Sequence, residues 1–248
     1  MKGNNINIQK LSGKLLEENI LFEDNHILII NKLPSQIVQG DKTGDTPLVD
    51  LVKDYIKVKY EKPGEVFLGV VHRLDRPVSG AVLFARTSKS LTRLNALIKN
   101  REVKKTYWAV VKNKPPKEND ILVSFLRRDE GKNKSFITGE NTKNAQMASL
   151  SYQVIAKSDN YYLLQIDLQT GRHHQIRTQL ASIGCPIKGD LKYGYPRSNS
   201  DGSIHLHARK LSFIHPVTLD PVSIVAGTPN DPIWNYFSQV SVDFEKSI

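Results

Sequence analysis

The chain has 248 residues, which is long enough to bury a sizeable core without disulfides or metal, so we expect one substantial domain. Its 35 lysines and arginines against 25 aspartates and glutamates give a net charge of +10, which favours a polyanionic partner such as nucleic acid. The single cysteine, Cys185, excludes an internal disulfide and a multi-cysteine zinc site. The sequence shows neither a membrane-length apolar run nor a secretory signal, so a cytoplasmic protein is expected.

Apolar periodicity predicts a hairpin, a helix, two buried strands and a second helix in the first half of the chain. Asp24 and Asn25 are typical of the hairpin turn, Pro47 starts the first helix, and Ser88 is expected to cap the second. The expected ranges are 20–23 and 26–31 for the hairpin, 48–56 for the first helix, 66–71 and 81–85 for the buried strands, and 88–98 for the second helix.

The second half of the chain predicts further strands and one short helix, which Gly184 ends. The expected ranges are 106–111, 150–156, 161–168, 205–215 and 222–226 for the strands and 176–183 for the helix. Segments 112–119 and 129–143 are polar and turn-rich, so we expect exposed loops there that carry basic residues. More than eight strands with three or four helices indicate an α+β (mixed α/β) single domain around a large sheet.

A charged loop between two of the buried strands is the most informative segment. In residues 72–80, Asp75 stands between Arg73 and Arg76, directly after an apolar run. Opposite charges within a few ångströms favour the ionised form of a carboxylate, and an ionised aspartate can act as a nucleophile. Charge alone also allows a solvated surface ion pair. The position of the loop at the edge of a core favours a functional site.

A second cationic segment, residues 170–177, is expected to occupy the first turns of a helix, where exposed backbone N–H groups favour anions. A phosphate or a carboxylate would suit this turn, although a solvated helix face stays open as an alternative. His173 and His174 could join His205 and His207 as metal ligands. Adjacent histidines point apart on a helix, however, and no carboxylate or cysteine stands at a supporting spacing, so we expect no metal.

The predicted strand around residue 107 interleaves basic and aromatic residues, as Lys105, Tyr107 and Trp108 show. This composition is used where bases stack on rings beside a track of phosphates. Because side chains alternate along a strand, Tyr107 and Trp108 point to opposite faces. At most one of them can therefore face a given site, and the other is expected in the core.

Taken together and in order, these segments resemble the RluA family of pseudouridine synthases, which convert uridine in RNA to its C-glycoside isomer. The similarity covers about residues 20–227. The matching blocks are HRLDR with Ser79-Gly80 at 72–80, KTYWA at 105–109, TGR-x-HQIR at 170–177, GDLKYG at 189–194 and LSFIHP at 211–216. The resemblance implies a catalytic domain over 20–240 with a large, mostly antiparallel sheet flanked by helices and loops. It also implies an N-terminal extension over 1–19 and no S4 RNA-binding domain.

The resemblance also implies roles for individual residues. Asp75 would be the catalytic aspartate, Tyr107 the ring packed on the target base, and Arg177 the partner of Asp75. Arg73 resembles the residue that enters the RNA stack in place of the flipped uridine. Further RNA contacts are expected from Arg76, Lys105, Arg172 and His174. Tyr107 is also a plausible general base, although its ordinary pKa near 10 would have to shift locally.

The implied partner is ribosomal or transfer RNA, and we expect a monomer that needs no cofactor and no obligate protein partner. A catalytically silent RNA-binding protein is the main alternative, and a hydrolase of nucleosides or sugars is a second one. The hydrolase would normally require two cooperating carboxylates, whereas these blocks offer one convincing candidate. The sequence leaves open attack at C1′ or elimination to a glycal. Pro77-Val78 and Thr178-Gln179 depart from the family pattern and bear on target choice.

Overall fold

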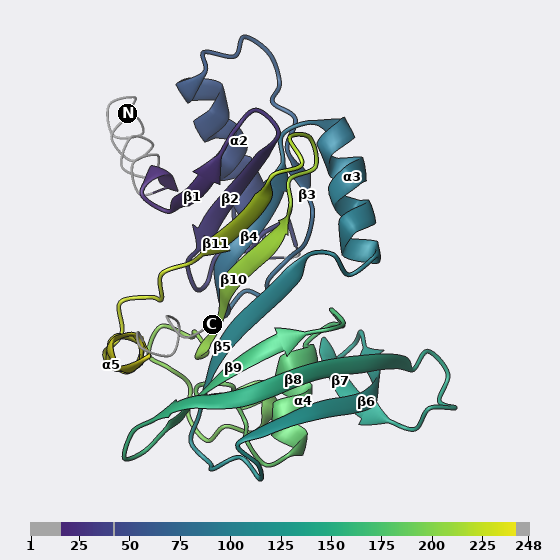
Figure 1. Cartoon of the computed structure of the whole chain (residues 1–248), viewed down its shortest axis with the longest axis vertical. Coiled ribbons are helices and arrows are strands. Elements are labelled where there is room, and N and C mark those ends of the chain that lie inside the picture. The colour runs from purple at the N-terminus through teal and green to yellow at the C-terminus, as the bar shows by residue number, and fades with distance from the viewer. Residues whose placement is uncertain (1–15, 42, 242–248) are drawn as a thin grey trace.

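A twisted sheet of eleven strands runs through the computed structural model, which describes residues 16–41 and 43–241 (Figure 1). The strand order is β1-β2-β4-β10-β5-β9-β8-β6-β7, with β11 paired to β10 and β3 paired to β4. The strands are β1 Ile20–Glu23, β2 Ile27–Lys32, β3 Gly69–Val70, β4 Ser79–Ala85, β5 Lys104–Val111, β6 Asn119–Asp129, β7 Lys134–Thr138, β8 Gln146–Lys157, β9 Tyr162–Leu168, β10 Leu206–Ile214 and β11 Pro221–Val225. The helices are α2 Leu48–Lys59, α3 Ser88–Lys99, α4 Gln175–Ser182, α5 Pro232–Val240 and the 3-10 turn η1 Leu191–Tyr193.

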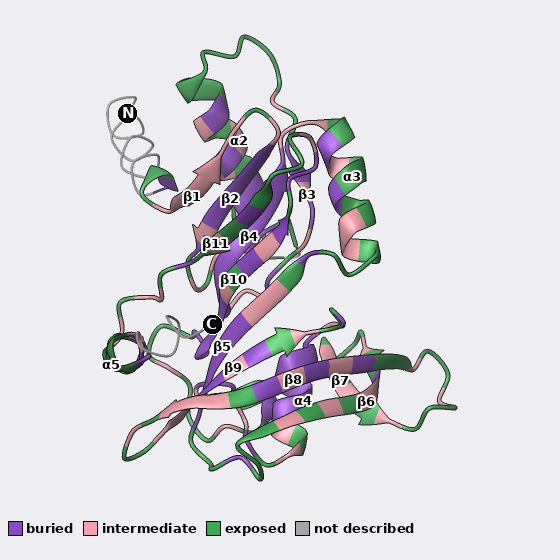
Figure 2. Ribbon diagram, in the orientation of Figure 1, coloured by how far each residue is buried: buried purple, intermediate pink, exposed green. Residues whose placement is uncertain are grey.

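Among the strand pairings of the described residues, only that between β4 and β10 is parallel, which confirms the expected mostly antiparallel sheet in an α+β fold. The centre of the sheet is buried on both faces, as the purple strands β2 and β4 in Figure 2 show. Successive residues of β2 enter different cores: Leu28 packs in the cluster that contains Val52 of α2, and Ile29 in the cluster that contains Leu94 of α3. The two helices therefore cover opposite faces of the sheet.

Helix α4 lies against the β6–β9 part of the sheet, where it orients the cationic segment (Figure 1). Its Ile176 and Leu180 join the buried cluster that includes Leu150 of β8. The Gln179 side chain adds a polar attachment, because its amide nitrogen donates to backbone carbonyls of β6 and β8 at 3.0 and 3.3 Å. Helix α5 covers another part of the sheet through Trp234, which packs in the same cluster as Trp108. No helix in the described ranges is both long enough and apolar enough to cross a membrane.

Most predicted elements are confirmed, and three details are wrong. The apolar run 66–71 forms a strand only at Gly69–Val70, because Gly69 already pairs with Ala85 at the end of β4, and Phe67, which precedes this pairing, is left 48% exposed. The expected loop 129–143 contains the strand β7, which extends the sheet beyond β6. The cap of α3 is Thr87, whose side chain accepts the backbone N–H of Ser90.

Gly80 allows β4 and β10 to approach closely just after the charged loop. Its φ is +115°, and a Cβ built there would lie 2.4 Å from the carbonyl oxygen of Ala208. We expect Gly80→Ala to lower the free energy of unfolding by roughly 2–5 kcal/mol through backbone strain and overpacking, as measured by urea titration. Gly64→Ala is the matched control, since nothing lies within 4 Å of a Cβ there. Equal losses in both variants would contradict this role of Gly80.

Candidate active site

The central cleft has a volume of about 1230 Å³ and is lined by the charged loop, the start of β5, the loop before α4 and part of β10. Its acidic lining residues are Asp75 and Asp167. The basic residues that line it are Arg73, Lys99, Arg101, Lys104, Lys105, Arg128, Arg172, Arg177 and Lys210. Such an excess of cations over these two carboxylates suits a polyanionic ligand that has to reach Asp75.

The charged loop is held in place by hydrogen bonds, including one from the last residue of β2. The Lys32 ammonium is fully buried and donates to the backbone carbonyls of Leu33, Gln36 and Arg76 at 3.0, 2.8 and 3.1 Å. Burial lowers the pKa of Lys32 to about 7, while the charge of Asp75 opposes this shift. The backbone N–H of Val78 donates to the carbonyl of Asp75 at 3.0 Å, which closes a turn around the carboxylate. The position of Asp75 is therefore fixed by backbone contacts on both sides.

Arg177 is the cation that holds Asp75. Its Nη1 donates to Oδ2 of Asp75 at 3.0 Å, and the Asp75 side chain stays 30% exposed to the cleft. Arg177 itself is 6% exposed and binds Asp190 through two bonds, from Nε at 2.7 Å and from Nη2 at 2.8 Å. Burial lowers the pKa of Arg177, but the hydrogen bonds and charges of Asp190 and Asp75 outweigh burial and raise it. The predicted pair between Asp75 and Arg177 is thus present, with a second carboxylate behind it.

Asp190 is the residue that sequence reasoning missed. It lies within a block noted for its resemblance, residues 189–194, but nothing in that block identified the partner of its carboxylate. The usable signal was the need for an acid: a buried arginine that uses one N–H to hold Asp75 has four further N–H groups to satisfy.

The two arginines beside Asp75 in the sequence do not hold its carboxylate. Arg76 forms an ion pair with Asp45 and also donates to Thr43 Oγ1 at 3.1 Å. Arg73 is exposed and lines the central cleft, and no ion pair of its side chain is found within residues 16–41 and 43–241. The expectation that both neighbours stabilise Asp75 is therefore wrong, because the stabilising guanidinium comes from α4. Arg73 remains placed to meet a ligand.

Tyr107 and Trp108 point to opposite faces, as the alternation predicts. Tyr107 is buried and lines the central cleft, whereas Trp108 lies in the core beside α5. Burial and the nearby charge of Asp75 raise the pKa of Tyr107. A general base at this position would need a lowered pKa. Because the pKa of Tyr107 is raised instead, its hydroxyl is protonated in the free protein. Lys105 lines the same cleft, and burial lowers its pKa.

The cationic segment is built differently from the expected helix start. Helix α4 begins at Gln175, so Arg172 and both histidines precede it and Arg177 alone lies in its first turn. The segment is fixed by Gln175, whose side-chain oxygen accepts from the backbone N–H of Arg172 at 3.0 Å. Arg172 is exposed beside the cleft and donates from Nε to the carbonyl of Met147.

The histidines serve hydrogen bonding. His173 and His174 do not point apart, since their rings stack with centroids 3.7 Å apart. His205 pairs with Asp231, and His207 bonds to Ser79 and to a backbone carbonyl. Across the described ranges, no group of three or more histidine, cysteine, aspartate or glutamate residues could hold a metal ion.

His174 is held more tightly than an RNA-contacting side chain requires. Its ring is 5% exposed, with Nδ1 at 3.0 Å from the Tyr193 hydroxyl and Nε2 at 3.4 Å from Oδ2 of Asp75. Burial lowers the pKa of His174 to about 2, with a further contribution from the charge of Arg177, so the ring is neutral. The predicted contact with RNA therefore has little surface available to it.

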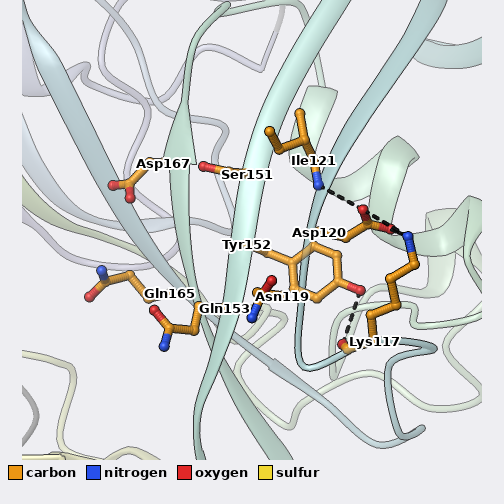
Figure 3. Close-up of a pocket in the computed structure, with 9 residues that line it drawn as sticks. All are labelled: Lys117, Asn119, Asp120, Ile121, Ser151, Tyr152, Gln153, Gln165 and Asp167. Atoms are coloured by element: carbon orange, nitrogen blue, oxygen red, sulfur yellow. Dashed lines mark hydrogen bonds and ion pairs between the residues drawn. The ribbon is translucent and has the colours of Figure 1, made fainter.

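A smaller pocket of about 580 Å³ lies over β6, β8 and β9 (Figure 3). Its ionisable groups are already engaged: Lys117 pairs with Asp120 at 3.1 Å, and the Tyr152 hydroxyl donates to the carbonyl of Lys117 at 3.2 Å. Asp167, which also borders the central cleft, accepts from Thr106 Oγ1. The central cleft is therefore the stronger candidate site, because it contains a partly exposed carboxylate that is held by a cation.

Known proteins resemble this chain in sequence and in fold. The sequence matches the family model described as RNA pseudouridylate synthase over residues 26–182. It is 33% identical over 219 residues to the uncharacterized RNA pseudouridine synthase YhcT of Bacillus subtilis, and the match covers 87% of this chain and 70% of the relative. It is 30% identical over 223 residues to the ribosomal large subunit pseudouridine synthase D of Zymomonas mobilis, covering 86% and 69%. The solved structure of human RNA Pseudouridylate Synthase Domain Containing 4 has the same fold, with a TM-score of 0.76 at 24% identity over 95% of this chain and 97% of that one.

Proposed function

The chain belongs to the RNA pseudouridylate synthase family, and from this premise we propose that it isomerises specific uridines of ribosomal or transfer RNA with Asp75 as the nucleophile. The observation that carries the proposal is the carboxylate of Asp75, held on one oxygen by Arg177 and partly exposed in a cleft lined with cations. A protein that only binds RNA gains nothing from an acid beside phosphates, because like charges repel.

Base flipping follows from the position of Asp75. The reacting bond of a uridine is not accessible inside a base stack, so the nucleotide has to leave the stack and enter a pocket. Tyr107 offers a ring at the wall of the cleft against which the extruded base packs. Arg73, exposed at the same cleft, takes the place that the base vacates.

The proposed chemistry begins at the ribose. Asp75 either attacks C1′ and displaces the uracil, or takes a proton from C2′ so that a glycal forms. The base then rotates and C5 bonds to C1′; in the first route this breaks the bond between Asp75 and C1′, and in the second Asp75 returns the proton to C2′. The C5 proton then leaves. Both routes use the carboxylate of Asp75, and Arg177 contacts one of its oxygens by charge and by a hydrogen bond. Neither route uses a metal or an organic cofactor.

Ribosomal RNA is the first substrate class to test, because the relative in Zymomonas mobilis is named for the large ribosomal subunit. The test is tritium release from RNA labelled at uridine C5, with ribosomal and transfer RNA prepared separately from cells that lack the gene. Release from one pool identifies the substrate class, since pseudouridine formation requires loss of that hydrogen. Release from free uridine would instead support a nucleoside-directed enzyme. Binding to RNA without release would exclude the proposed reaction.

Tyr107 is expected to act through both its ring and its hydroxyl. No hydrogen bond to this hydroxyl occurs among the residues that the structure describes, so it is available to the substrate. The charge of Asp75 helps to raise the pKa of Tyr107, and a bond to the sugar would remove that charge before the C5 proton has to leave. Tyr107→Phe should therefore bind RNA normally in filter assays but release tritium at least about 100-fold more slowly. Wild-type release would limit Tyr107 to packing.

A further inference from the structure

His174 lies between the proposed nucleophile and a buried tyrosine. Its backbone is left-handed, with φ of 53° and ψ of 25°, at the residue that caps α4. This conformation is uncommon outside glycine and asparagine, and here it turns the ring back toward the charged loop. Nε2 then lies 3.4 Å from Oδ2 of Asp75, and Nδ1 lies 3.0 Å from the hydroxyl of Tyr193.

The neighbours of the ring determine which of its nitrogens carries hydrogen. A neutral imidazole has one N–H donor and one acceptor nitrogen. The cations Arg177, Lys192 and Arg128, together with His173, add to burial in keeping the ring neutral, and Asp75 is the acid beside it. A lone pair on Nε2 would face the lone pairs of a carboxylate, whereas a proton on Nε2 would be attracted to them. The hydrogen therefore belongs on Nε2.

Tyr193 supplies the complementary hydrogen at Nδ1. Its hydroxyl accepts the backbone N–H of Ser135 at 2.8 Å, so its single hydrogen is available for donation. Acceptors within its reach include Nδ1 of His174 at 3.0 Å and the carbonyl of Ser135 at 3.2 Å. The Tyr193 ring is fixed between the guanidinium of Arg177, 5.0 Å from the centroid, and the ammonium of Lys134, 4.9 Å away. The donor is thus held in place by cation–π contacts on a buried side chain.

We propose that His174 is a positioning residue that, in the Nε2–H form selected by Tyr193, donates to Oδ2 of Asp75 and so leaves Oδ1 as the reacting oxygen. This inference rests on the proposed role of Asp75. Oδ2 accepts from Arg177 and lies 3.4 Å from Nε2 of His174, while Oδ1 has no hydrogen-bond partner among the described residues. The distance of 3.4 Å is long for a hydrogen bond, and such contacts tighten when substrate fills a site.

The first test reads the tautomer directly. Long-range proton–nitrogen NMR spectra of histidine-labelled protein distinguish the two neutral forms and the cation, and comparison with the His174→Gln protein assigns the resonance. We expect the Nε2–H form from about pH 5 to about pH 8, and a shift toward the Nδ1–H form in Tyr193→Phe. An Nδ1–H ring in the wild type, or a ring that becomes charged in this range, would overturn the proposal.

The second test replaces His174 with either of two amide side chains of different length, asparagine or glutamine. The glutamine amide nitrogen overlaps the position of Nε2, whereas that of asparagine overlaps Nδ1. His174→Asn also tolerates the left-handed backbone. We expect His174→Asn to lower kcat between about 10-fold and 100-fold with KM nearly unchanged, and His174→Gln to recover most of that loss. Equal kcat in both variants, whether wild-type or low, would refute the positioning role.

His215→Asn is the matched control for loss of stability. His215 is buried and its Nε2 lies 3.0 Å from Oδ2 of Asp24, away from the central cleft. This variant should lose stability without a change in kcat.

The two proposals can fail separately. Activity in Asp75→Asn would refute the nucleophile, whereas an Nε2–H ring together with wild-type kcat in His174→Asn would refute only the role of His174.

Discussion

Replacement of Asp75 by asparagine should abolish isomerisation while RNA binding persists. Asparagine has the same shape and keeps an oxygen that can accept from Arg177, but it cannot form the proposed ester or accept a proton from C2′. We expect tritium release to fall by at least about 10³-fold, the order of loss seen when a nucleophile is removed. Affinity for RNA should be unchanged or slightly higher, because a negative charge beside the phosphates is gone.

Asp159→Asn is the matched control, because Asp159 is exposed in the turn between β8 and β9 and lies outside the central cleft. It should release tritium at the wild-type rate. Filter binding over a range of salt concentrations separates loss of affinity from loss of chemistry, since phosphate contacts weaken with salt. If Asp75→Asn keeps a tenth or more of the wild-type rate, Asp75 is not the nucleophile.

Removal of the Arg177 side chain should have the second-largest effect, on activity and on stability together. Arg177→Ala leaves Asp75 without its cation and leaves Asp190, 1% exposed, as a buried and unpaired carboxylate. Breaking such a buried pair costs roughly 3–5 kcal/mol of unfolding free energy. We therefore expect no detectable tritium release and a lower urea midpoint.

A double variant separates the two losses. Arg177→Ala with Asp190→Asn removes the buried charge, so it should recover much of the stability of the single variant. Activity should stay absent, because Asp75 still has no cation beside it. Urea titration and tritium release on the same preparations check both statements. Recovery of activity with stability would show that Arg177 acts on the fold alone.

The elements that depend on local pattern could be predicted from the sequence. The hairpin at β1 and β2, helix α2 and the fully buried β4 follow from apolar periodicity and turn residues. Asp75, Tyr107 and Arg177 were identified by ordered motif blocks, and the structure brings Asp75 and Arg177 into contact.

The features that could not be predicted depend on contacts distant in sequence. Arg76 adjoins Asp75 in the chain, yet its side chain pairs with Asp45, because neighbouring residues of a turn point in different directions. Asp190 meets Arg177 only once η1 packs beside α4. The left-handed backbone of His174 likewise has no signature in the sequence.

The place of β10 between β4 and β5 has a consequence for synthesis of the protein on the ribosome. Residues of β10 leave the ribosome after β4 and β5, so neither of those strands can complete its pairing until β10 has been made. Asp75 lies in the loop before β4, and Arg177 lies on α4, which packs against the β6–β9 part of the sheet, so β10 joins the two parts of the fold that supply them. A nascent chain that is itself surrounded by RNA therefore completes its candidate site only after β10 has been made.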